Sequence, residues 1–587
     1  MNEKDLEAAV DRARVSRGST PPPLVEEQEG GDHDHHSTTT NTTTHDHDND
    51  KKNFAPIRPA TATSKSRRHS LSSTLRRERS NNGYGVEDLI DHSSSSSLEA
   101  PDDEPATPQD PNAGQEVDPF EVTWDGGDLD PLCPRSMPTW RKWTIITITS
   151  IGSFAVTHGS AIYTASYEQM NAEFHTSRLV ATIGLSLYVL GIALGPFWSP
   201  LAEFYGRRPI YLASFVAFII WLIPSAVAKN IETMLVARFF QGLAGSAFLS
   251  VSGGTVSDMF VRDKMLMPMA IFSLAPFVGP STGPFVGGII VTYANWRVMH
   301  YYLLVMSGVV LLSLALFVPE TYHPVLLKRK AVRLRKETKD DRWFAPIERS
   351  NKSIPVTVAL SLLRPFQILM YEPMAVILNV YTAVLLGLLY LFFGAFPLIF
   401  RTNHGFNAWQ VGLTFMGLLV SMVIACLTTP FWNRVRFWLI ERREKKTGIL
   451  KDEPEDQLPQ VIFGAPLITG GLFWFGFTSV PEIHWIVPVI GSAVFGLGMS
   501  YAFTGVFTFL VAAYPRYAAS ALASNALVRC SFAAAFPLFG YQMYEALGFQ
   551  WATGLLAFIT LALLPFPYIF FRFGKRIRAR SRYATSS

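Results

Sequence analysis

From Trp143 onward, the chain is a series of apolar stretches separated by short polar segments. Six stretches precede a longer polar segment, at 143–164, 179–200, 210–228, 233–255, 266–292 and 297–318. Six more follow it, at 373–399, 409–431, 460–480, 484–510, 519–541 and 550–572. Each is long enough to cross a hydrocarbon core of about 30 Å as a helix, and membrane helices tolerate interior glycine and proline. We therefore predict an all-α membrane protein with twelve transmembrane helices.

The first 138 residues are polar and show neither helical nor strand periodicity, with serine and threonine runs at 93–97 and 38–44. We expect a disordered cytosolic tail. Histidines alternate with aspartates in this tail, which is a composition that can hold a transition metal, but nothing there fixes ligand geometry and we expect no metal site. These histidines are His33, His35, His36, His45 and His47. Ser70 and Ser80 follow paired arginines and are candidate phosphorylation sites.

The long polar segment divides the chain into two halves. We expect an N-terminal six-helix bundle at 139–318, a cytosolic linker at 319–371, a C-terminal six-helix bundle at 372–573 and a basic cytosolic tail at 574–587. In the linker, the stretch HPVLLKRKAVRLRKE mixes apolar residues with dense lysine and arginine, which predicts an amphipathic helix. Lysine and arginine gather in alternate loops, so the positive-inside rule predicts that both termini are cytosolic.

Composition narrows the class of protein. A hydrophobic content of 49% and a mean hydropathy of +0.19 exclude an ordinary soluble enzyme. Three cysteines in distant segments, Cys133, Cys426 and Cys530, cannot build a disulfide framework. The sequence has no GxxxxGK[ST] phosphate loop, channel filter or histidine box, so we expect neither ATP use, nor catalysis, nor a cofactor. Two six-span halves favour a secondary transporter that rocks one half against the other.

The loop between the second and third spans reads SPLAEFYGRRPI. In it, Glu203 precedes a glycine turn at Gly206 and two arginines, Arg207 and Arg208. An acid and two arginines at this spacing can lock helix ends by ion pairs that break and reform, which would make a cytosolic gate. Taken alone, the arginines are as well explained as topogenic charges. The loop nevertheless resembles the signature loop of the major facilitator superfamily, except that Ser199 stands where the family usually has glycine.

The fourth span contains RFFQGLAGSA, with Arg238 about six residues, or roughly 9 Å, inside the membrane boundary. A guanidinium at that depth is costly unless it faces a wet cavity or a partner. Arg238 with Gln241 resembles the fourth-span motif of proton-coupled members of the superfamily, and the resemblance implies a role in proton transfer. A structural tether is the alternative.

The fifth span contains GPSTGPFVGG, with three glycines four residues apart on one face. Small residues at this spacing let two helices meet backbone to backbone, and the prolines bend the helix. Generic tight packing explains the pattern by itself. The pattern also resembles the antiporter motif of drug:proton exporters, which implies outward transport. The motif residues are Gly279, Pro280, Gly283, Pro284, Gly287 and Gly288.

The resemblance extends from the first span to the last and is closest to fungal twelve-span drug and polyamine exporters, through segments such as NWRVMHYY and FPLFGYQMY. It implies the fold of the superfamily, a pseudo-symmetric pair of six-helix bundles. It also implies the family range of exported compounds, which are antifungals, toxins, polyamines, weak acids and secondary metabolites.

Few ionisable residues lie inside the predicted spans. Arg529 is the deepest, about ten residues or roughly 15 Å into the eleventh span. A proton-coupling group must change its affinity for the proton with the side that is open, and our candidates are His158, Arg238, Glu168 and Asp258. We expect the substrate cavity to include Arg529, Asn525 and Gln241, with Arg529 receiving any anionic group. A hydrogen-bonding tie of Arg529 to the backbone or to Asn525, one turn earlier, is equally compatible with the sequence.

The sequence therefore favours a proton-coupled exporter of small lipophilic molecules that works by alternating access at the plasma membrane, ahead of the vacuolar membrane. The scarcity of interior acids argues against a polyamine carrier, whereas a weak-acid carrier stays open. A transporter-like membrane sensor that signals through its tail is an alternative of another class. The expected partners are the lipid bilayer, a small-molecule substrate and protons. We expect a monomer and no nucleic-acid partner.

Overall fold

The computed structural model describes residues 118–261, 264–349, 353–448, 453–579 and 581. This part of the chain is almost entirely helical, and the extended pairing within it is an isolated bridge between Glu121 and Phe344. The predictions for the histidine-rich tract and for Ser70 and Ser80 lie outside the described residues.

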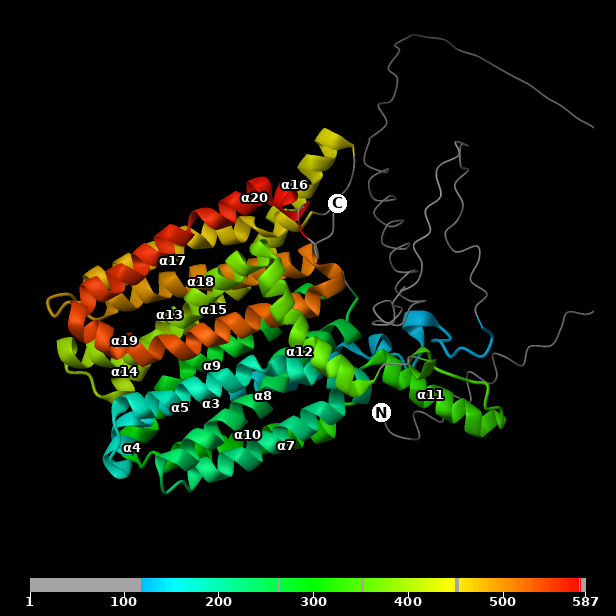
Figure 1. Ribbon diagram of the computed structural model, residues 1–587, viewed down its shortest axis with the longest axis horizontal. Coiled ribbons are helices and arrows are strands. Elements are labelled where there is room, and N and C mark those ends of the chain that lie inside the picture. Colours follow the sequence, from blue (N-terminus) through cyan, green and yellow to red (C-terminus); the bar gives the residue numbers. More distant parts are fainter. Residues whose placement is uncertain (1–117, 262–263, 350–352, 449–452, 580, 582–587) are drawn as a thin grey trace, which may run out of the picture.

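The first bundle begins with α3 (Thr139–Ile162), which continues through a 3-10 turn, Tyr163–Ser166, into α4 (Tyr167–Phe174). The second span is α5 (Arg178–Ala193), followed by a 3-10 turn and α6 (Trp198–Tyr205). The remaining spans are α7 (Arg207–Ala226), α8 (Ile231–Met259), α9 (Leu266–Tyr293) and α10 (Arg297–Phe317). These helices lie side by side in one half of the molecule (Figure 1).

The second bundle begins with α13 (Pro373–His404). It continues with α14 (Ala408–Thr414), α15 (Met416–Leu427), α16 (Thr429–Thr447), α17 (Pro459–Thr478), α18 (Ile486–Ala513), α19 (Ala518–Leu563) and α20 (Pro565–Arg578). Eleven helical segments of the described chain are long and apolar enough to span a membrane, and the last runs from Ala518 to Arg578. Gly548 breaks that segment with non-helical backbone angles, φ 75° and ψ 163°, so it contains two spans and the predicted twelve are present.

The two bundles have the same internal pairing. In the first, α3 packs on α9, α5 on α8, and α7 on both α8 and α10. In the second, α13 packs on α19, α15 on α18, and α17 on both α18 and the part of α19 that follows Gly548. Spans one to six therefore correspond in order to spans seven to twelve. The predicted pseudo-symmetric pair of six-helix bundles is confirmed.

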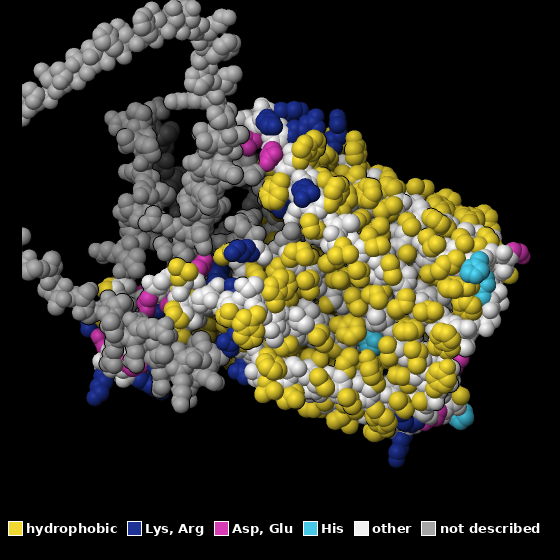
Figure 2. All heavy atoms as spheres, turned by 180° about the vertical axis from the view of Figure 1, so that it is seen from behind, with side chains coloured by type: hydrophobic (Ala, Val, Ile, Leu, Met, Phe, Trp, Pro, Cys, Tyr) yellow, Lys and Arg dark blue, Asp and Glu magenta, His cyan; other side chains and the backbone are white. Residues whose placement is uncertain are grey.

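The flanks of the bundles are apolar. Along α10, the side chains of Val305, Val309, Leu312 and Leu316 follow helical spacing and are 60–69% exposed. Figure 2 shows hydrophobic side chains over most of the visible flank, with lysine and arginine gathered mainly towards one end. An apolar surface of this extent in water would be an association site, whereas in a bilayer it is the lipid-facing surface.

We call the end of the bundles where α3, α7 and α13 begin the basic end, because Arg141, Lys142, Arg207, Arg208 and Lys575 lie there. The other end is the distal end. Two linker helices, α11 (His323–Thr338) and α12 (Ile354–Tyr371), lie at the basic end (Figure 1). Along α12, Val356, Leu360, Leu363 and Met370 form an exposed apolar stripe, so α12 is also amphipathic. The sequence predicted an amphipathic helix only at α11.

Residues 118–138 are folded, which corrects the expected boundary of the disordered tail. We call them the docked segment. Val122 forms a small core with Leu327, Ala331 and Ala345, and its backbone N–H donates to the Phe344 carbonyl at 2.9 Å. Lys330 of α11 donates to Asp125 and Asp130 of the segment at 3.0 and 3.2 Å. The amphipathic face of α11 is therefore covered by protein, because the chain before the first span packs on it.

The expected basic tail from residue 574 is also partly corrected. Helix α20 continues to Arg578, whose side chain is buried and donates to both carboxylate oxygens of Glu455 at 2.9 Å. The final turn of this helix is therefore part of the second bundle, and the tail begins after it.

Candidate functional site

At the basic end, the turn between α6 and α7 is built around Gly206, which has φ +98°. A Cβ atom there would lie 2.2 Å from Oε2 of Glu320, so both the backbone angle and the space require glycine. Glu320 accepts hydrogen bonds from the backbone N–H groups of Arg207 and Arg208 at 2.8 and 3.3 Å. A carboxylate thus occupies the positive N-terminus of α7.

The Arg207 side chain joins this turn to the end of α8. Its Nε donates to Oδ2 of Asp258 at 3.1 Å, and the guanidinium lies over the Tyr322 ring at 4.6 Å. Glu203 is within electrostatic reach of the same guanidinium, whereas Arg208 is exposed and donates to the Ala315 carbonyl at 2.8 Å. Asp258, one of the proton-coupling candidates, therefore belongs to the same ion-pair cluster as Arg207.

His323 of α11 connects the docked segment to this cluster. The Nε2 atom of His323 lies 2.7 Å from the Asp258 carbonyl oxygen, and Nδ1 accepts from Trp124 Nε1 at 3.2 Å. Since Nδ1 must be unprotonated to accept, the arrangement requires the neutral ring. Burial lowers the pKa of His323 to about 4, and the bond to the Asp258 carbonyl, which favours the protonated ring, opposes this shift only in part. Neither Glu320 nor His323 was among the predicted site residues.

The second bundle has its own polar cluster at the basic end. Arg443 of α16 binds Asp456 with an N–O distance of 2.9 Å, and Arg578 forms the fork to Glu455 described above. Tyr514 donates to Glu372, at the start of α13, at 3.0 Å. Sequence reasoning missed this cluster because it joins four distant stretches of the chain, at residues 372, 443–456, 514 and 578.

Inside the first bundle, Arg238 is fully buried and well supplied with partners. It donates to the backbone carbonyls of Gly159 and Ser160 on α3 at 2.8 and 3.1 Å. Its guanidinium lies between the rings of Tyr163 and Tyr188, at 4.3 and 4.2 Å from their centroids. These contacts tie α8 to α3 and α5.

Gln241 of α8 is fully buried and hydrogen-bonded to α7. Its Nε2 donates to the Trp221 carbonyl at 2.9 Å and to Ser225 Oγ at 2.5 Å, so the side chain faces α7 inside the bundle. Its place in the substrate cavity stays a prediction, and in this structure the side chain is held by α7.

His158 lies between three helices of the first bundle. Its Nδ1 is 3.0 Å from Thr282 Oγ1 of α9, and its ring contacts those of Phe154 and Tyr302. The side chain is fully buried, and Nε2 has no hydrogen-bond partner among the described residues. A single titratable ring is therefore held against the glycine-rich helix.

The glycines of α9 serve two contacts. Cβ atoms added at Gly279, Gly283 and Gly287 would all collide with α3, and the first two would meet backbone nitrogens at 2.5 and 2.7 Å. A Cβ at Gly288 would instead lie 2.4 Å from the Ala408 carbonyl of α14, and one at Gly412 of α14 would lie 2.5 Å from the Pro284 carbonyl. The motif therefore packs α9 on its own bundle with one face and on the second bundle with the next.

Arg529 lies about 16 Å along α19 from its first residue. The guanidinium is 5.0 and 5.6 Å from the ring centroids of Phe507 and Phe503 on α18. It forms no ion pair within the described chain, and Nε has no hydrogen-bond partner. The suggested tie to Asn525 is absent, because Asn525 Nδ2 donates to Asn379 and Thr382 of α13 instead.

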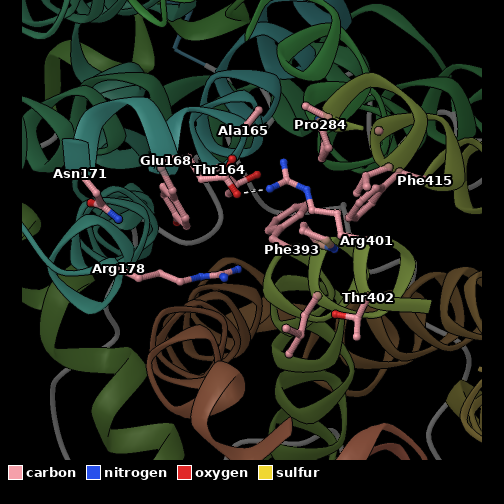
Figure 3. Close-up of a pocket in the computed structure, with 16 residues that line it drawn as sticks. Thr164, Ala165, Glu168, Asn171, Arg178, Pro284, Phe393, Arg401, Thr402 and Phe415 are labelled. Atoms are coloured by element: carbon pink, nitrogen blue, oxygen red, sulfur yellow. Dashed lines mark hydrogen bonds and ion pairs between the residues drawn. The ribbon is translucent and has the colours of Figure 1, made fainter. Parts of the chain in front are cut away.

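A cavity of about 260 Å³ opens at the distal end between the bundles. Glu168 of α4 forms an ion pair there with Arg401 of α13, drawn as a dashed line in Figure 3. Arg178 lies across the cavity, with its guanidinium 4.2 Å from the Tyr541 ring of α19. Two arginine contacts, one from each bundle, therefore bridge the cavity mouth.

The two bundles meet where Gly288 of α9 and Gly412 of α14 pack closely, which we call the joint. Two pseudo-symmetric bundles with such a joint, and with separate polar clusters at their basic ends, define a secondary transporter of the alternating-access type. A sequence profile of the Major Facilitator Superfamily matches residues 149–537. The chain belongs to this superfamily.

Named relatives match most of the chain. Efflux pump atB of Aspergillus terreus is 50% identical over 79% of this chain and 90% of its own length. A probable drug/proton antiporter of Saccharomyces cerevisiae, YHK8, is 40% identical over the same shares. Among solved structures, the proton:xylose symporter XylE aligns with a TM-score of 0.53 at 14% identity, over 74% of this chain and 96% of that one. This last likeness concerns the fold alone.

Proposed function

We propose that the protein exports small lipophilic compounds, such as drugs, toxins or secondary metabolites, in exchange for protons. The observation that carries the proposal is the packing of α9, because all four glycines of its motif lie at the contacts with α3 and α14. The names of the relatives, efflux pump and drug/proton antiporter, support the same direction of transport and the same coupling ion.

The distribution of buried acids favours this function over polyamine transport. Within the described chain, the buried carboxylates lie at the basic end, and they are Asp130, Asp258, Glu320, Glu372, Glu455 and Asp456. Four of them bind an arginine side chain or the backbone at the start of α7. A polycation held midway across the membrane would need acids there.

In the proposed cycle, the joint between α9 and α14 and the bridges Glu168–Arg401 and Arg178–Tyr541 close the distal end. The ion-pair clusters at the basic end hold the helix ends of each bundle while the bundles rock. The lysine and arginine content of the basic end assigns it to the cytosol. Both termini are then cytosolic, and we assign the transporter to the plasma membrane, where export removes a toxic compound from the cell.

We assign proton coupling to His158. Its ring is buried, its Nε2 lacks a partner, and its other nitrogen bonds Thr282 within the α9 motif. Arg238 holds helices together instead, and Asp258 and Glu168 act through the ion pairs of the basic and distal ends. Replacing His158 by glutamine should therefore flatten the pH dependence of export, and an unchanged pH profile would contradict the assignment.

Accumulation of labelled neutral, anionic and cationic compounds in cells with and without the protein tests the function. We expect the protein to lower accumulation of at least one aromatic compound, and a protonophore to abolish the difference. Export that persists without a proton gradient would contradict the coupling. Removal of residues 1–117 separates the sensor alternative, because an exporter keeps transport without this tail.

A further inference from the structure

Arg529 stands out among the cations deep in the spanning helices because no described residue compensates its charge. Charged side chains inside a membrane protein normally pair with one another or with backbone carbonyls. Arg238 follows this rule, and Arg578 and Arg207 have carboxylate partners. Among the residues that the structure describes, Arg529 has no carboxylate partner, and a polar neighbour is the thiol of Cys530.

The surroundings of Arg529 suit a flat ligand. Phe503 and Phe507 present their rings to the guanidinium at 5.6 and 5.0 Å. Phe503 also stacks on Phe277 of α9, with ring centroids 5.0 Å apart, so the aromatic group crosses from one bundle to the other. Such rings bind flat apolar molecules by stacking and tolerate many shapes.

The position of Arg529 connects it to the contact between the bundles. Tyr390 of α13 lies within electrostatic reach of the guanidinium, and its hydroxyl is 3.2 Å from Ser160 Oγ of the first bundle. Arg529 is itself partly exposed rather than enclosed. A ligand that binds it therefore touches groups that bridge the two halves.

We propose that Arg529 recognises the anionic group of an aromatic or conjugated substrate carrying one negative charge, such as a carboxylate or an acidic enol. A guanidinium binds a carboxylate through two parallel N–H donors, which gives both affinity and orientation. The rings of Phe503 and Phe507 then hold the flat part of the molecule. A cationic substrate would meet an unpaired positive charge at this place, so the site selects against it.

This inference rests on the proposed export function and names the substrate class for it. Binding of two matched probe pairs to the purified full-length protein tests it: naphthalene-2-carboxylate with its carboxamide, and anthracene-2-carboxylate with its carboxamide. Each carboxamide has nearly the shape of its acid without the charge. We expect the wild-type protein to bind the carboxylate of at least one pair about ten-fold more tightly than the carboxamide.

Arg529→Gln should weaken carboxylate binding by about 10- to 100-fold and change carboxamide binding by less than about three-fold, since a charge-assisted hydrogen bond is lost and the rings remain. Arg364→Gln, which removes an exposed arginine of α12, is the matched control and should change neither. Should Arg529→Gln fail to fold, Arg529→Lys keeps the charge without the fork and should lose most of the carboxylate preference.

Equal binding of acid and amide by the wild-type protein in both pairs would overturn the assignment. So would a folded Arg529→Gln protein that loses both probes equally, because the arginine would then only position the helix. Export of the bound probe from proteoliposomes is measured separately. Arg529-dependent binding without proton-driven export would contradict the proposed function, whereas export of the carboxamide alone would contradict the inference.

Discussion

Arg238 and Arg529 lie deep in spanning helices of different bundles, and their surroundings differ. Arg238 is enclosed, with two backbone carbonyls and two tyrosine rings as partners. Arg529 has two phenylalanine rings beside it and no anionic partner in the described part of the chain. The first arginine supplies contacts that hold three helices together, and the second keeps its charge available. A buried charge therefore indicates a structural or a ligand-binding role according to what surrounds it, and not by its depth alone.

The largest expected effect is the difference in stability between variants that remove Arg238 and Arg529. Arg238→Gln should lower the unfolding free energy by about 3 kcal/mol or more, because it leaves the carbonyls of Gly159 and Ser160 without their donors. Arg529→Gln should leave the melting temperature unchanged or raise it, since it removes an uncompensated charge. Thermal unfolding of the two purified variants in detergent measures this. A greater loss in Arg529→Gln than in Arg238→Gln would reverse the comparison.

The joint between the bundles gives the next effect. Gly288→Ala would place a Cβ atom 2.4 Å from the Ala408 carbonyl and should cost about 1–3 kcal/mol of packing between α9 and α14. Export should fall by about ten-fold or more while the first bundle stays folded. Gly308→Ala on α10, where nothing lies within 4 Å of the added Cβ, is the control. Equal export rates in the two variants would show that the joint does not limit the cycle.

Acidic pH should release the docked segment through His323. The docked state keeps this ring neutral with a pKa of about 4, whereas a released histidine takes up a proton near pH 6.5. Docking is therefore strongest above pH 6.5 and weakens as the pH falls towards 4, by up to about 3 kcal/mol for this shift.

Cys133 reports the release, because it is fully buried in the docked segment. Its reaction with 4,4′-dithiodipyridine, a disulfide that thiols attack even in acid with release of 4-thiopyridone, should accelerate as the pH falls, in a background with Cys426 and Cys530 replaced by alanine. In a His323→Gln variant the pH dependence should be lost. Acceleration of the same size in both proteins would assign the effect to another group.

The smallest effect is expected at the distal cavity. The Glu168 side chain is 71% exposed, and exposed ion pairs contribute less than about 1 kcal/mol. Glu168→Gln should therefore change the export rate by less than about five-fold, and high salt should narrow the difference from the wild-type protein. Complete loss of export would give Glu168 the central coupling role that we assign to His158.

Much of the fold could be predicted, because spans follow from hydrophobic length and the glycine face of α9 from a four-residue spacing. The partners of buried polar groups could not. Glu320 reaches Arg207 across more than a hundred residues, and the apolar residues of α8 are spread around the whole helix, so its pattern did not show that Gln241 faces α7. In the docked segment, Phe120, Val122 and Trp124 alternate with polar residues over too short a run to predict an element, and the core that Val122 enters is completed by residues of α11 about two hundred positions away.

Exchange of substrate for protons is the central claim, and the lumenal pH of proteoliposomes tests it most directly. Liposomes with the purified protein are loaded with the neutral aromatic compound that the accumulation panel ranks highest, and then diluted into buffer without it. We predict that the lumen acidifies as the compound leaves and protons enter, and that protein-free liposomes show no change. An alkaline shift, or efflux with no pH change, would contradict antiport.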